Sequence, residues 1–506
     1  MSRCRLVRVG AEPRLERLRE RSRQAELRQP HAGPGGALAR RLRGHLQGPE
    51  KGPCSRKRSQ QTPVRKWMTS SLPGKRMCLS LTVVAMVNST DPHGSPNAST
   101  KDLLDNIKNP RYNWSPEIRG VILSSILYGM LIVKIPVGYL SGIYSIRKMV
   151  SCALILSSLS SLLIPLAADA GEMPLIACRV VQGLGQGTVS IAQHMVWVKW
   201  APPLERGRLT SLSVSGLMLG PFISLLATGF ICQALGWPYV FYIFGACGCA
   251  LGLLWFVLFY DDPKDHPCIS VDEKEFITSS LMAQVSSSGQ HLPIKAMLKS
   301  LPLWAISLGC FAFSWTNHVM FLYSPTFISS KLHVNVTENG MLSALPYLFS
   351  WLLGIMVGQV ADLFLSRNML RVITIRKLFT TLGLLLPSFF GICLCHLSFS
   401  FHSTIIFLIL ASSTVVFCVV GILINPLDIA PRYYGFLKGV TVLIGMTGGL
   451  TSSTLAGIIL NQDPESSWSK IFFLMAAINV ISLTFYLIFA KAEIQDWAKE
   501  KQHTRL

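Results

Sequence analysis

Residues 149–168 read MVSCALILSSLSSLLIPLAA, twenty positions without one charged side chain. An α-helix of about 20 apolar residues is long enough to cross the hydrocarbon core of a bilayer, which is about 30 Å thick. Ten further stretches of similar length and character lie at 118–142, 174–198, 208–232, 238–260, 303–326, 339–362, 378–396, 403–426, 436–461 and 469–490. The sequence therefore predicts an all-α polytopic membrane protein whose main partner is the lipid bilayer.

The composition supports this class and argues against a nucleic-acid partner. Half of the 506 residues are apolar and only 14% are charged, as is typical of an integral membrane protein. The net charge of +21 is concentrated near the start, because residues 1–76 hold 20 Lys and Arg against 5 Glu. A basic segment rich in Pro, Gly and Ser without an apolar period favours disorder, so we expect residues 1–76 to be a disordered N-terminal segment.

The spacing of the spans predicts two halves. A short apolar run, Met77 to Val87, follows Lys75 and Arg76 and is too short to cross a bilayer in the usual way. If it is counted as a shortened first helix, the hydrophilic stretch at 261–302 separates two sets of six spans. The sequence then divides into a transmembrane half at 77–260, a central cytoplasmic loop at 261–302, a second half at 303–490 and a cytoplasmic tail at 491–506. Six plus six spans is the outline of a major-facilitator transporter.

Two signals agree on the orientation in the membrane. Most Lys and Arg residues of the short loops fall on the same side as the C-terminal tail, which the positive-inside rule places in the cytosol. The opposite side carries the glycosylation sequons Asn88-Ser-Thr, Asn97-Ala-Ser and Asn335-Val-Thr. We therefore expect the loop 88–115 to face outward and these three asparagines to carry glycans.

An arginine inside the span at 174–198 is the first candidate for function. Arg179, Gln182 and Gln186 are three and seven residues apart, so they share one face of a helix. Gly183 and Gly187 allow a second helix to approach closely. A guanidinium binds carboxylate or phosphate with two parallel hydrogen bonds, so this face predicts an anion site. The alternative is an arginine near a helix end that extends to water.

Other candidates are weaker or absent. Lys134 lies inside the span at 118–142 and is either a second cation of the substrate site or a side chain that extends to the cytosolic surface. No metal-ligand spacing, nucleotide-binding loop or pair of nucleophile and base rises above chance, so we predict neither an enzyme nor a bound cofactor.

Several motifs resemble those of one transporter family. Gly358-Gln-Val-Ala-Asp362, followed by Arg367, is similar to the cytosolic loop signature of the major facilitators, and a less complete copy precedes Arg147. The resemblance implies a gating role for these residues. Three longer motifs resemble the anion/cation symporter family over roughly residues 77–506: KWAPPLERGRL (199–209), YDDPKDHP (260–267) and NPLDIAPRYYG (425–435).

The resemblance implies a substrate class and an energy source. Members of the family carry phosphate, urate and other organic anions, driven by sodium, protons or membrane potential, with chloride as a modulator. Arg179 and Arg76 match anion-coordinating arginines of the family. Gln186 stands where proton-linked members have a glutamate, and Phe313 where they have an arginine. An amide cannot titrate, so we expect coupling to sodium or membrane potential. The resemblance also implies a location in the plasma membrane, at the apical face of an epithelium.

Two alternatives and one partner stay open. The protein could be a proton-coupled carrier of organic anions in vesicles or lysosomes. It could also be a non-transporting regulatory membrane protein, because its first helix is altered. The C-terminal residues Thr504-Arg505-Leu506 fit a peptide that binds a PDZ scaffold as an added strand, with Leu506 as the anchor.

Overall fold

The computed structural model describes residues 79–86, 112–140, 144–200, 203–262, 275, 294–367, 369–396, 400–462 and 466–498, with some side chains, including those of 203–217, left out. The chain divides into the units Met1–Lys57 and Arg58–Leu506, and every described residue belongs to the second. The expected disorder of residues 1–76 and the predictions for Arg76, Asn88, Asn97, Thr504 and Leu506 lie outside the described residues.

The described residues are almost entirely helical, which confirms the predicted all-α class. The first half contributes a helical segment at 79–86 and the helices α5 (Pro116–Leu140), α6 (Ile146–Ala170), α7 (Glu172–Trp200), α8 (Pro203–Ala234) and α9 (Trp237–Leu258). The second half contributes α11 (Ile294–Leu298), α12 (Leu301–Asn317), η2 (His318–Leu322), α13 (Ser324–Leu332), α14 (Val336–Ser366), α15 (Val372–His396), α16 (Phe401–Ser413), η3 (Thr414–Val416), η4 (Val419–Leu423), α17 (Asn425–Ile429), η5 (Pro431–Tyr433), α18 (Tyr434–Gln462), α19 (Ser467–Phe489) and η6 (Asp496–Ala498). Within these residues, nine helices are long and apolar enough to cross a membrane.

Two predicted spans are interrupted rather than continuous. The span at 303–326 contains the π-helical turn η2 between α12 and α13, and the span at 403–426 continues α16 through η3 and η4 to α17. In both places a proline opens the next short helix, Pro325 in α13 and Pro426 in α17. Proline cannot donate a backbone hydrogen bond to the preceding turn, so the regular ladder stops there and the backbone adjusts locally.

The short segment at 79–86 lies in the interior of the bundle. Leu79, Leu81 and Met86 are all fully buried and belong to one apolar cluster with residues of both halves. The backbone N–H of Tyr112 donates to the Met86 carbonyl at 2.7 Å, and the Tyr112 hydroxyl donates to the Asp169 carboxylate. Burial and this hydrogen bond raise the pKa of Tyr112 well above its usual range. The predicted shortening of the first span concerns residues before Leu79, so it stays a prediction.

Helices within each half approach one another through glycine. A Cβ atom at Gly129 of α5 would lie 2.1 Å from the Val180 carbonyl oxygen of α7, and one at Gly183 would lie 2.2 Å from the Ile126 carbonyl oxygen. A Cβ at Gly187 would meet Val133 at 2.4 Å. The predicted close approach at Gly183 and Gly187 is therefore confirmed, with α5 as the partner helix.

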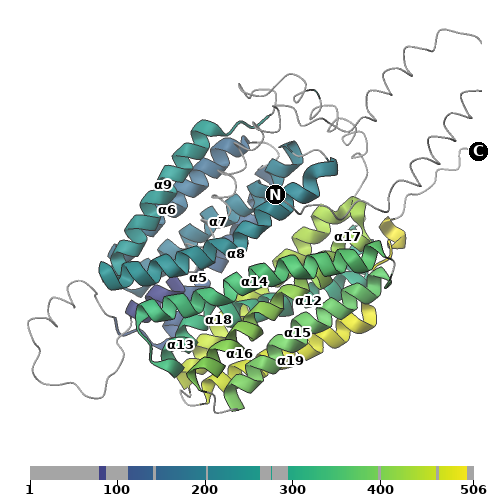
Figure 1. The fold of residues 1–506 in the computed structure, drawn as a ribbon. Coiled ribbons are helices and arrows are strands. Elements are labelled where there is room, and N and C mark those ends of the chain that lie inside the picture. Colours follow the sequence, from purple (N-terminus) through teal and green to yellow (C-terminus); the bar gives the residue numbers. More distant parts are fainter. Residues whose placement is uncertain are drawn as a thin grey trace, which may run out of the picture. The chain divides into compact units, whose positions relative to one another are not determined.

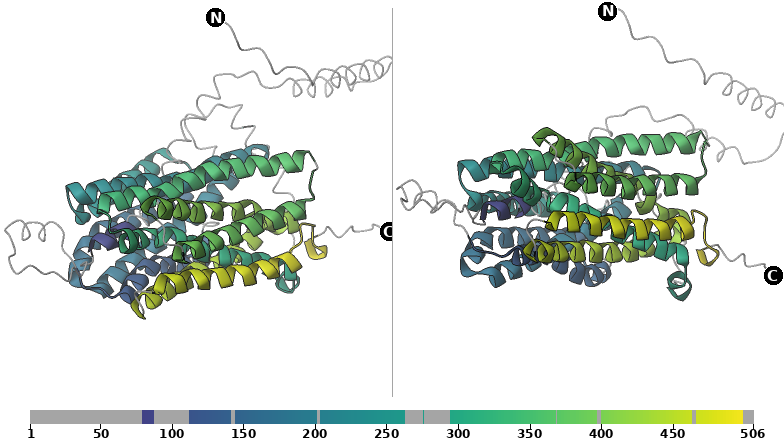
Figure 2. Two further views of the ribbon diagram at one scale, coloured as in Figure 1. Left: turned by 60° about the horizontal axis from the view of Figure 1, so that its bottom comes forward. Right: turned by 90° about the horizontal axis from the view of Figure 1, so that it is seen from below.

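The two halves touch along two helix pairs, α5 with α18 and α8 with α14 (Figures 1 and 2). A Cβ at Gly120 of α5 would lie 2.8 Å from the Gly457 Cα of α18, and one at Gly229 of α8 would lie 3.3 Å from the Gly340 Cα of α14. All four glycines lie near the end of the bundle where α5 and α14 begin. The positive-inside rule places this end outside the cytosol, and we call it the outer end.

Three glycines near the opposite, cytosolic end have different surroundings. A Cβ added at Gly358 of α14, or at Gly435 or Gly439 of α18, would meet no described atom within 4 Å. The glycines of these helices are thus closely packed at the outer end and open at the cytosolic end. An arrangement of this kind corresponds to an inward-open state.

The contrast between buried and open glycines leads to a stability prediction. Gly129→Ala places a methyl group against the α7 backbone, which cannot move away as a flexible side chain could. We expect a destabilisation of about 1–3 kcal/mol from overpacking, measured as a lower unfolding temperature of the purified protein in detergent. Gly358→Ala is the matched control and should leave this temperature unchanged or raise it slightly, because alanine favours the helix. Equal effects of both substitutions would contradict the packing described above.

Candidate functional site

Arg179 lies inside the first half and begins a chain of two side-chain hydrogen bonds. Its guanidinium is 0% exposed, and its Nη1 donates to Gln182 Oε1 at 2.5 Å. Gln182 Nε2 in turn donates to the Ser161 hydroxyl of α6 at 2.7 Å. The side chain therefore does not extend to water, and the alternative of a solvated arginine at a helix end is wrong for this conformation.

Gln186 continues the same face of α7 one turn further. Its side chain is 4% exposed, and its Nε2 is buried without a hydrogen-bond acceptor among the described residues. Buried amide groups in proteins nearly always have a partner, so an unsatisfied one calls for an explanation. An N–H donor on the face that carries a buried guanidinium can bind an oxygen atom of an anion.

Glycine fixes the direction in which this face points. Gly183 and Gly187 lie against α5, and a Cβ at Gly185 would lie 2.6 Å from the Ala153 carbonyl oxygen of α6. Two sides of α7 are thus bound to neighbouring helices at backbone contact distance. The remaining side carries Arg179 and Gln186, so the sequence positions them with little freedom to rotate.

Lys134 lies on the side of α5 that faces the second half. It follows Gly120 by 14 residues, and at about 100° per residue the two positions are within about 40° of each other around the helix. Gly120 contacts Gly457 of α18. Lys134 is half-buried and makes no hydrogen bond or ion pair with a described residue. The structure thus places this lysine near the boundary between the halves, closer to the cytosolic end than Arg179.

The predicted gating residues are separate from the buried face. Gly358 and Asp362 lie in α14 near its cytosolic end, and Arg367 follows it; Asp362 and Arg367 are exposed. Arg147 opens α6, where its Nε donates to the Phe256 carbonyl of α9 and its guanidinium lies 4.7 Å from the Phe256 ring. These contacts join α6 to α9 inside the first half, so a gating role for Arg147 stays a prediction.

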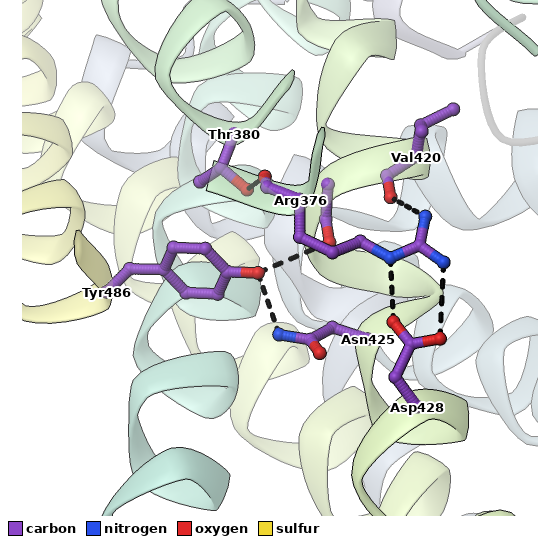
Figure 3. Close-up of polar contacts among 7 residues, drawn as sticks. Arg376, Thr380, Val420, Asn425, Asp428 and Tyr486 are labelled. Carbon is purple, nitrogen blue, oxygen red and sulfur yellow. Dashed lines mark hydrogen bonds and ion pairs between the residues drawn. The ribbon is translucent and has the colours of Figure 1, made fainter. Parts of the chain in front are cut away.

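A second buried arginine belongs to the second half and is bound to a carboxylate (Figure 3). Arg376 of α15 reaches Asp428 of α17 through Nε at 2.7 Å and Nη2 at 3.2 Å, and its Nη1 donates to the Val420 carbonyl at 2.9 Å. Beside it, Asn425 Nδ2 donates to the Tyr486 hydroxyl at 2.8 Å. These contacts join α15, η4, α17 and α19 around one buried ion pair.

Neither Arg376 nor Arg119 stands out from hydropathy or helical spacing alone. Arg119 is the fourth residue of α5 and half-buried, with its Nε fully enclosed. The sequence feature that could have pointed to Arg119 is a charged side chain just inside the outer end of the predicted span at 118–142. Asn335, the described sequon asparagine, is exposed immediately before α14. Within the described residues, no group of three His, Cys, Asp or Glu side chains could hold a metal ion.

Known proteins with the same architecture identify the family. The family model of the Major Facilitator Superfamily matches residues 77–453. The chain is 67% identical over 432 residues to the sodium-dependent phosphate transport protein 1 of Homo sapiens, covering 85% of this chain and 92% of that protein. It is 49% identical over 445 residues to a probable small intestine urate exporter of Homo sapiens, covering 85% and 90%.

Solved structures agree at the level of the fold. A bacterial homologue of the human lysosomal transporter Spinster, in an inward-facing conformation, superposes with a TM-score of 0.62 at 14% identity and covers 85% of this chain and 96% of its own. The inward-open xylose transporter XylE from E. coli gives 0.61 at 13% identity, with 85% and 96% covered. The chain therefore belongs to the Major Facilitator Superfamily and, within it, to the anion/cation symporter family.

Proposed function

We propose that this protein is a secondary active transporter that moves inorganic phosphate, urate and other organic anions by alternating access. The observation that carries the proposal is the fully buried Arg179 on a helix face shared with Gln182 and Gln186. The names of the relatives, phosphate transport proteins and a urate exporter, support the same substrate class.

Arg179 is the main counter-charge for the substrate in this proposal. A guanidinium in an apolar interior is costly, and an anion that pairs with it lowers that cost. Gln186 Nε2 supplies a neutral donor to the same anion. Lys134 attracts the anion toward the cytosolic side, and Arg76 adds a further cation by resemblance to the family. Because Arg179 is enclosed here, the anion reaches it in other states of the transport cycle.

Sodium or the membrane potential provides the driving force. The relatives are named sodium-dependent, which supports sodium as the coupling ion. Gln186 cannot release a proton, which disfavours coupling to protons through this position. Chloride acts as a modulator, since it competes for the same fixed cations. A proton-coupled carrier of organic anions in vesicles or lysosomes is the alternative within transport.

The cellular setting is proposed from the sequence. We place the protein in the plasma membrane, at the apical face of an epithelium, with glycans on Asn88, Asn97 and Asn335. The tail residues Thr504 and Leu506 bind a PDZ scaffold. A non-transporting regulatory role is the other alternative, and the altered, basic N-terminal residues 1–76 would then carry it.

Replacing Arg179 tests the anion site. Arg179→Ala should lower phosphate and urate uptake into proteoliposomes about 10- to 100-fold, the loss expected for hydrogen bonds to a charged group. Arg179→Lys should retain part of the activity, because it keeps the charge but not the planar fork. Arg371→Ala removes an exposed cation and is the matched control. Uptake by Arg179→Ala at the level of this control would exclude the proposed site.

Replacing Gln186 tests the coupling ion. Gln186→Glu places a carboxylate beside Arg179, where it competes with the substrate anion. We expect low uptake at neutral pH and partial recovery as the pH falls toward about 5, because protonation removes the competing charge. Gln186→Met loses the donor without adding a charge and should show no such recovery. If the unmodified protein already follows the pH profile of Gln186→Glu, the proton-coupled alternative is favoured.

Deleting residues 1–57 separates transport from regulation. The transport proposal predicts unchanged uptake per folded molecule, since the described helices all lie in the second unit. The measurement is sodium-driven and potential-driven uptake by the full and shortened chains, normalised to protein content. Uptake that appears only after the deletion would show that the basic segment regulates the transporter.

A further inference from the structure

Arg119 differs from the other two buried arginines in what surrounds its side chain. Arg179 donates to an amide and Arg376 to a carboxylate. The Arg119 side chain makes no hydrogen bond or ion pair with any residue in the described part of the chain, and its Nε is enclosed. The Tyr323 side chain is its electrostatic neighbour. A cation in this setting has donors available for a ligand.

The position of Arg119 is the outer contact between the halves. The next residue, Gly120, would place a Cβ 2.8 Å from the Gly457 Cα and 3.1 Å from the Ser453 carbonyl oxygen of α18. The Tyr323 hydroxyl donates to that same Ser453 carbonyl at 2.6 Å. Arg119 from the first half and Tyr323 from the second therefore meet where α5 and α18 close the outer end.

The helix register gives the depth of Arg119 relative to Arg179. Helices α5 and α7 run in the same direction and touch at Gly129 and Gly183. Arg119 lies ten residues before Gly129, and Arg179 lies four residues before Gly183. The difference of six residues corresponds to about 9 Å at 1.5 Å per residue. Arg119 is thus the outer of two cations along the first half. The separation from Arg179 is about the size of a small anion together with its hydrogen-bond contacts on both sides.

We propose that Arg119 and the Tyr323 hydroxyl form an outer capture site that binds the transported oxyanion first and passes it to Arg179. This inference rests on the proposed function. When α5 and α18 separate at the outer end, the Arg119 guanidinium becomes accessible and pairs with a phosphate, carboxylate or urate oxygen. The Tyr323 hydroxyl then turns its single O–H from the Ser453 carbonyl to the anion. In the inward-open state the same contact covers Arg119, so the site acts on anions that arrive from outside.

Sided kinetics test this asymmetry. Phosphate uptake and phosphate efflux are measured for the full chain in oriented vesicles, with external and internal concentrations varied separately. Arg119→Gln should raise KM for external phosphate at least about 5-fold and change KM for internal phosphate less than about 2-fold. Arg119→Lys should restore part of the external affinity, because it keeps the charge. Lys331→Gln, which removes an exposed cation at the end of α13, is the matched control and should change neither.

Each other outcome overturns part of the argument. An external KM for Arg119→Gln equal to that of the unmodified protein would exclude the capture site. Equal changes in the external KM for Arg119→Gln and Lys331→Gln would mean that surface charge attracts the anion in general. Similar losses of affinity for external and internal phosphate, not restored by Arg119→Lys, would mean that Arg119 has a structural role. Arg179→Ala in the same vesicles separates the two proposals: if it abolishes uptake while Arg119→Gln behaves as unmodified, only the capture site fails. No uptake by the unmodified protein would overturn both.

Discussion

The arrangement of the first half depends on burying one guanidinium in an apolar bundle. A charged side chain inside a membrane is expensive, so its surroundings must hold it with hydrogen bonds and close packing. Gln182 accepts a hydrogen bond from Arg179 and is itself bound to Ser161, and the glycines of α7 supply the packing. The surroundings of Arg179 thus combine a hydrogen bond from the guanidinium with close packing of the helix that carries it.

The two halves use buried arginine in different ways. In the second half, Arg376 is bound by both oxygens of Asp428 and by a backbone carbonyl. Removing one partner of such a pair would leave the other as an unpaired buried charge. It stabilises the cytosolic end of the second half around α15 and α17. Arg376 is thus paired with a carboxylate in the second half, whereas Arg179 of the first half is the arginine that we propose to bind the substrate.

The sequence predicted the helices well and the contacts between them less well. Runs such as 149–168 exceed the span length and contain no charge, so their helical state follows from hydropathy alone. The turns at His318 and Pro426 were missed, since interruptions within an apolar run do not change its hydropathy. The shared face of Arg179 and Gln186 followed from helical spacing. Ser161 lies 21 residues from its partner Gln182, and Asp428 lies 52 residues from Arg376, so these contacts are known only from the tertiary structure.

Glycine explains how the halves can be rigid and still separate. Inside the first half, Gly129 and Gly183 face the backbone of the neighbouring helix at distances that no side chain could share. Between the halves, Gly120 faces Gly457 and Gly229 faces Gly340, so the backbones approach closely at these two points. A glycine pair has no side chains that must leave their neighbours before the helices can part, so at these points the contact opens with little loss of packing. Alternating access needs an outer contact that forms and breaks in each cycle, and the glycine pairs at the outer end meet that requirement.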